Sequence, residues 1–211
     1  MKSIETFSKY LNDLAREKKY ENILVNFKNN SSDFSKEEIK SNIYIVRNVI
    51  DAHRHEKLYG AALEFISEYE IEMGAAQNKI VISSFLWLLI FQLDEEVSKE
   101  NSANITKLLD KINSIIEFLD LSIDYYDMPI VFLLKKTTGI KKISAQTALK
   151  EVIRLLKSAK IKMNERLKEA IKRDSYASSS IASVFGKAGH PDRGFKFLKY
   201  VGVNPFEEGT S

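Results

Sequence analysis

The chain of 211 residues contains no cysteine, only three prolines and only eight glycines. The absence of cysteine excludes disulfides, thiolate nucleophiles and zinc sites built on thiolates. With 44% hydrophobic and 29% charged residues, the composition also excludes the disordered and collagen-like classes. Because a chain of this length buries roughly 70% of its unfolded surface, we expect one domain over residues 1–211.

Long hydrophobic runs are also missing. The most apolar stretch, residues 80–93, has 14 positions and includes two serines and a glutamine, whereas a membrane span needs about 20 apolar residues. We therefore expect a buried helix there and no membrane partner. The N-terminal segment is amphipathic, with interspersed acidic residues and no hydrophobic signal core. This pattern predicts a cytoplasmic protein.

Period-two alternation between glycine-rich turns, which a sheet requires, is not evident, whereas apolar residues recur at helical spacing. The sequence therefore predicts an all-α fold. Ser35 with Glu38 forms a capping-box pattern, Asn164 and Pro191 mark further helix starts, and Gly189 marks a stop. About eleven helices are expected, at residues 3–17, 20–29, 36–54, 58–70, 76–98, 103–120, 126–137, 144–158, 164–173, 175–188 and 191–201.

Short connections between these helices predict about five antiparallel helical hairpins. The segment REKKYENILVNF, residues 16–27, aligns with HEKLYGAALEFI, residues 55–66, so that a tyrosine opens the second helix of each hairpin. Equivalent second helices recur about every 40 to 45 residues. Such spacing is typical of an α-solenoid with irregular repeats, in which each pair of helices buries its apolar face against its neighbours.

The second helix of each aligned segment resembles that of a tetratricopeptide repeat, most clearly at Tyr59, Ala62, Leu63 and Glu64. Residues 187–205, KAGHPDRGFKFLKYVGVNP, resemble the turn and second helix of a pentatricopeptide repeat, and residues 83–122 are similar to helical modules of bacterial conflict-system proteins. The resemblance implies a tetratricopeptide-like scaffold or adaptor in a bacterial defence or regulatory complex. The longer, irregular spacing means that no binding residues carry over from these families.

Charge is distributed unevenly along the chain. Residues 1–130 carry 15 basic and 22 acidic side chains, and residues 131–211 carry 17 basic and 7 acidic ones. Residues 135–173 alone hold thirteen basic and three acidic side chains. Lys150, Arg154 and Lys157 share one face of the helix predicted at residues 144–158. The predicted partner or nucleic-acid surface comprises Lys135, Lys136, Lys141, Lys142, Lys150, Arg154, Lys157, Arg166 and Arg173.

Three explanations of this basic segment stay open at this point: a solvated face without a ligand, a nucleic-acid surface, and a surface for an acidic protein. The complementary halves also permit head-to-tail association of copies. Our first interpretation is a non-enzymatic protein-interaction scaffold, and the alternative is a nucleic-acid-associated helical protein.

No constellation of side chains predicts catalysis, a metal or a cofactor. His53 and His55 lie two residues apart on a helix, so they point in different directions and cannot bind one metal ion. The serines at residues 178–180 lack a nucleophile elbow and are interpreted as small residues that let two helices approach. Trp87, in an all-round apolar helix, is expected in the core.

Overall fold

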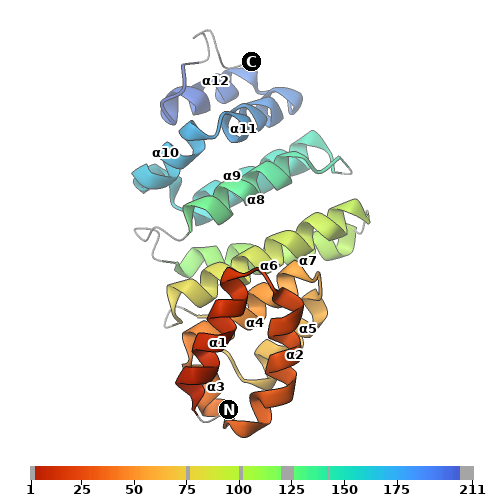
Figure 1. The fold of residues 1–211 in the computed structure, drawn as a ribbon. Helices are drawn as coiled ribbons and strands as arrows, with labels where there is room; N and C mark the ends of the chain where they lie inside the picture. The colour runs from red at the N-terminus through yellow and green to blue at the C-terminus, as the bar shows by residue number, and fades with distance from the viewer. Residues whose placement is uncertain (1–2, 75–76, 100–101, 120–125, 142, 205–211) are drawn as a thin grey trace. The chain divides into compact units, whose positions relative to one another are not determined.

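The computed structural model describes residues 3–74, 77–99, 102–119, 126–141 and 143–204. Within these ranges the chain forms twelve α-helices and two short 3₁₀ helices, without a strand (Figure 1). The predicted all-α class is therefore confirmed. No helix in the described ranges has both the length and the apolar character that crossing a bilayer demands.

The chain divides into two compact units, residues Met1–Gln92 and Leu93–Ser211. The boundary lies within α6, and the change of charge at residue 130 falls inside the second unit. The first unit contains α1 (Ile4–Arg16), α2 (Tyr20–Asn30), η1 (Ser31–Asp33), α3 (Lys36–Ser41), α4 (Ile43–His55), α5 (Tyr59–Glu68) and the first part of α6 (Lys79–Ser98).

In the first unit, α4 packs against α1, α2 and α5. Aromatic rings form much of its core. Phe7 stacks on Phe34 with ring centroids 5.3 Å apart, and Phe27 meets the edges of Phe65 and Tyr69 at 5.4 and 5.7 Å. Such aromatic pairs add to the stabilisation that burial of their apolar area supplies.

The helix predicted at residues 36–54 is two helices, α3 and α4, because Asn42 interrupts it. Asn42 has an extended backbone, with φ −90° and ψ 94°, and its side-chain Oδ1 accepts a hydrogen bond from the amide of Ile45. Asn42 is thus the N-cap of α4. The predicted Ser35 and Glu38 capping box is present at the start of α3.

α6 contains the apolar stretch, and eight of its apolar residues are buried: Val81, Ile82, Phe85, Leu86, Leu88, Leu89, Ile90 and Leu93. The predicted place of Trp87 in the core is wrong, because this side chain is only half-buried. It packs at 6.0 Å against the ring of Phe91, which lies 36% exposed under the guanidinium of Arg54.

The second unit contains the end of α6, α7 (Ser102–Phe118), α8 (Asp127–Thr138), α9 (Ala145–Ser158), η2 (Ile161–Met163), α10 (Glu165–Arg173), α11 (Ser175–Lys187) and α12 (Pro191–Tyr200). α9 packs against α7 and α8, and α11 packs against α8, α9, α10 and α12. The helix starts predicted at Asn164 and Pro191 are confirmed.

Three connections between helices have the same geometry. In each, one residue with a left-handed backbone follows the first helix, and the second helix begins two residues later. The amide after the left-handed residue donates a hydrogen bond to a carbonyl five residues back, at 2.8 or 2.9 Å. The left-handed residues are Lys18 before α2, Lys57 before α5 and Gly189 before α12. The two segments aligned by sequence therefore make the same turn.

Candidate functional site

Five members of the predicted basic surface form ion pairs within the second unit. The pairs are Lys135 Nζ with Asp174 Oδ2 at 2.9 Å, Lys136 Nζ with Asp94 Oδ1 at 2.7 Å, Arg154 Nη1 with Asp110 Oδ1 at 2.6 Å, Arg166 Nε with Asp127 Oδ2 at 3.3 Å, and Arg173 Nε with Glu169 Oε1 at 3.1 Å. Four of these five pairs join different elements, at separations of 39 to 44 residues. Much of the positive charge is thus balanced inside the unit.

Two of these pairs have electrostatic consequences. The hydrogen bond with Asp110 raises the pKa of Arg154. Although burial acts to raise the pKa of Asp174, hydrogen bonds from Lys135 and from the amide of Ala177 bring it below its ordinary value. Asp174 therefore has two roles, as the partner of Lys135 and as the N-cap of α11.

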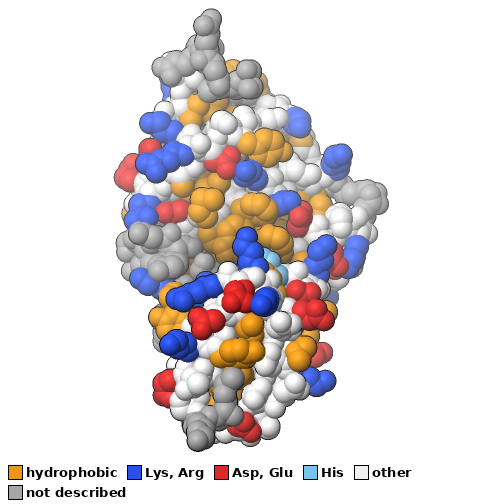
Figure 2. Space-filling model, viewed as in Figure 1, with side chains coloured by type: hydrophobic (Ala, Val, Ile, Leu, Met, Phe, Trp, Pro, Cys, Tyr) orange, Lys and Arg blue, Asp and Glu red, His pale blue; other side chains and the backbone are white. Residues whose placement is uncertain are grey.

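Lys141, Lys150 and Lys157 are exposed and have no ion-pair partner among the described residues. Lys142 lies outside those residues. On the face of the second unit drawn in Figure 2, Lys and Arg side chains are interspersed with Asp and Glu. The visible charges therefore do not form a continuous basic surface.

The two histidines of the first unit, His53 and His55, make contacts that stabilise the local structure. His53 Nδ1 lies 2.8 Å from the carbonyl oxygen of Val49, and the His55 ring stacks on Tyr20 with centroids 3.8 Å apart. Burial is the main cause that lowers the pKa of each imidazole. Across the described ranges, no three His, Asp or Glu side chains are grouped so that they could hold a metal ion.

One row of exposed residues on α11 has only small side chains or none. Ser175, Ser179, Ser183 and Gly186 follow one another at spacings of four and three residues and are all exposed. Ser178, by contrast, is 3% exposed and lies on the buried side. The sequence interpretation of the serines thus fits Ser178, but Ser179 belongs to an uncovered face.

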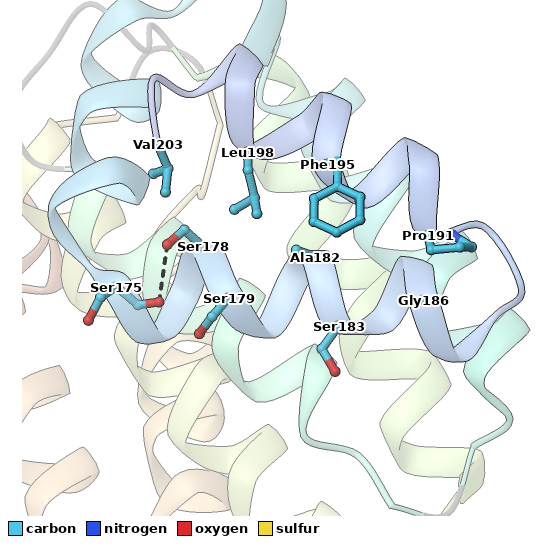
Figure 3. A pocket seen from close by; sticks show the side chains of 11 residues that line it. Ser175, Ser178, Ser179, Ala182, Ser183, Gly186, Pro191, Phe195, Leu198 and Val203 are labelled. Carbon is cyan, nitrogen blue, oxygen red and sulfur yellow. Dashed lines mark hydrogen bonds between the residues drawn. The ribbon is translucent and has the colours of Figure 1, made fainter. Parts of the chain in front are cut away.

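A hollow of about 350 Å³ lies between this face and α12. In Figure 3, Phe195, Leu198 and Val203 point from the α12 side toward the serines of α11. Phe195 is 48% exposed. The hydroxyls of Ser178 and Ser179 donate to the carbonyls of Ser175 and Tyr176 in their own helix. The lining is therefore mainly apolar, and these two hydroxyls already have hydrogen-bond partners.

A second hollow, of about 640 Å³, lies on the other side of the same face. It is lined by the connection between α8 and α9, by the start of α9 and by α11, and its charged lining residues are Lys141 and Lys187. Ser179 and Ser183 line both hollows. They form a low ridge between two depressions.

The close approach of α12 to α11 depends on Gly194. A β-carbon at this position would lie 2.9 Å from the carbonyl oxygen of Ala182 and 3.3 Å from Cβ of Phe185. The rings of Phe185 and Phe197 stack at 6.2 Å beneath this contact, and the Tyr200 hydroxyl donates to the carbonyl of Ile161. These contacts give the first hollow a fixed wall.

Comparisons with known proteins find no protein family, no curated protein and no solved structure that matches this chain. The candidate site therefore depends on the geometry of α11 and its neighbours. The sequence signal that could have indicated this surface is the spacing of Ser175, Ser179, Ser183 and Gly186 along one helical face.

Proposed function

We propose that the protein is a non-enzymatic interaction module whose face on α11 binds a partner protein. The observation that carries this proposal is the pair of hollows on either side of Ser179 and Ser183. Pockets of a few hundred Å³ with apolar linings are typical of binding sites. Here they flank two exposed serines whose side chains are too small to fill them.

A tetratricopeptide-like stack of helical hairpins is the architecture that we propose for presenting this face. The recurring left-handed turn supports it. The packing of α4 on both α1 and α2, and of α11 on both α8 and α9, also supports it, because each repeat of a stack contacts its neighbours. The ion pairs at separations of 39 to 44 residues match the repeat spacing expected from the sequence.

Binding is a better interpretation than catalysis for these hollows. Among the described residues, their linings contain serines but no His, Asp or Glu. A serine nucleophile requires a neighbouring base to remove its proton. Ser178 and Ser179 instead donate their protons to backbone carbonyls of α11.

The test is site-specific photo-crosslinking in the native cell, with benzoylphenylalanine at Ser183 and, as a control, at Ser114, an exposed serine of α7. We expect a protein crosslinked only from Ser183. That protein is then purified and its affinity for the unmodified chain measured. Ser183→Arg should weaken binding at least tenfold, and Ser114→Arg should leave it unchanged. Equal affinity for wild type and Ser183→Arg would refute the proposed site.

A further inference from the structure

We propose that the partner segment is an amphipathic α-helix with acidic residues beside its apolar face. This inference rests on the proposed function and adds the chemistry of the partner. The partner helix lies along the exposed face of α11, places large apolar side chains in the two hollows, and directs carboxylates toward Lys141 and Lys187.

The shape of the surface favours a helix. The small side chains of Ser179 and Ser183 permit close approach of a second backbone, and the depressions on both sides accept side chains that project to the left and right of it. An extended peptide would need backbone hydrogen-bond partners, as at the edge of a sheet. The backbone of α11 is occupied with its own helical bonds, whereas a partner helix satisfies its own backbone groups.

The first hollow favours apolar side chains. Phe195 and Leu198 supply uncovered apolar area, and the nearby hydroxyl of Ser179 is already bonded to its own helix. When leucine or phenylalanine side chains of the partner cover Phe195 and Leu198, the hydroxyl of Ser179 keeps its hydrogen bond. The favourable free energy is that of removing apolar surface from water.

The second hollow determines the charge of the partner. Lys141 and Lys187 line it. In the part of the chain that the structure describes, neither lysine has an ion-pair partner and no carboxylate lines either hollow. The nearby Lys135 is held by Asp174. A partner with lysines on this flank would meet two uncompensated positive charges, and one with glutamates would meet complementary ones.

The experiment is a display selection of peptides on the full chain. The library consists of 21-residue helices with fixed leucines along one face and with Glu, Lys, Gln and Ser randomised on both flanks. Binders to the double variant Ser179→Arg/Ser183→Arg are removed by counter-selection. We expect glutamate to be enriched on one flank of the recovered helices and lysine to be depleted there.

Affinities of a selected peptide then test the contacts. Lys141→Glu/Lys187→Glu should weaken binding at least tenfold at low salt and less at high salt. Lys196→Glu/Lys199→Glu is the matched control, because these exposed lysines of α12 line neither hollow, and it should change affinity less than twofold. A chain that ends at residue 204 should bind as the full chain does.

Any of the following results would overturn the inference: no enriched helix, enrichment without glutamate, equal losses in the two double variants, or tighter binding after removal of residues 205–211. Self-association that Ser183→Arg abolishes would also overturn it, since the occupant would then be a second copy. A crosslinked natural partner that binds through a basic or extended segment leaves the proposed function intact and refutes only this inference.

Discussion

At the scale of single residues, two of the three left-handed turn positions are occupied by lysine and are therefore strained. Lys18 and Lys57 have φ of 58°, a conformation that costs a non-glycine residue roughly 1–2 kcal/mol. Gly189 adopts the equivalent conformation before α12 without that cost. The sequence predicted that a helix ends at Gly189. It did not indicate a left-handed residue at Lys18 or Lys57, because lysine does not favour this backbone conformation.

We predict that Lys57→Gly stabilises the protein by about 0.5–1 kcal/mol, because relief of strain exceeds the added entropy of the unfolded glycine. Gly189→Ala should destabilise it by about 1 kcal/mol, since no described atom beyond the adjacent residues lies within 4 Å of the new β-carbon and only the backbone is strained. Gly186→Ala, three residues earlier within α11, should have the opposite sign. Urea unfolding measures the change in unfolding free energy for all three variants. Changes of the same sign for Gly189→Ala and Gly186→Ala would contradict this account.

His53 makes stability depend on pH. Burial lowers its pKa from the ordinary 6.5, so the unfolded chain binds this proton more tightly than the folded one. Stability is therefore expected to fall as the pH is lowered through 6.5 toward the folded-state pKa. His53→Phe should reduce the slope of unfolding free energy between pH 8 and 5.5. An NMR titration midpoint above 6.5 for His53 would contradict the prediction.

At the scale of elements, helical periodicity predicted most of the helices but not the break at Asn42. Ile39, Ile43, Val46 and Ile50 keep one apolar stripe across it, so the pattern reads as continuous. The interruption depends on a tertiary contact: Oδ1 of Asn42 accepts a hydrogen bond from Ser8 of α1 at 3.1 Å. Periodicity contains no information about that partner.

We predict that Asn42→Ala destabilises the first unit by about 1–2 kcal/mol, through loss of the α4 cap and of the acceptor for Ser8. Asn42→Asp retains an acceptor oxygen and should recover most of this loss. Thermal unfolding followed by circular dichroism compares the two variants. If alanine and aspartate are equally destabilising, the hydrogen bonds are not the cause.

At the scale of the whole molecule, the density of basic residues along the sequence did not predict which of them are free to bind a partner. The sequence locates the basic residues, but the acidic partners of Lys136 and Arg154 lie 42 and 44 residues away. Such pairing is set by the packing of helices. For the same reason, the hollows beside α11 were not predicted: their walls come from segments that only the fold brings together.

The last prediction concerns nucleic acids. The exposed, unpaired lysines of α9 are Lys150 and Lys157, because Arg154 is held by Asp110. Lys141, just before this helix, is the third exposed lysine of the predicted surface without an ion-pair partner among the described residues. Each phosphate contact contributes about 0.9 to the slope of log affinity against log salt, so these lysines give only weak and shallowly salt-dependent binding. We expect no complex with labelled RNA or DNA in 150 mM salt.

Lys150→Glu/Lys157→Glu is the appropriate variant for this measurement, because it removes the unpaired charges of α9 and leaves the Arg154 pair in place. Changing Arg154 to glutamate as well would place a second carboxylate beside Asp110. Loss of binding could then not be distinguished from loss of helix packing. A complex that survives 150 mM salt and disappears in the double variant would favour nucleic-acid binding as the function. The face of α11 would then be a secondary feature of the molecule.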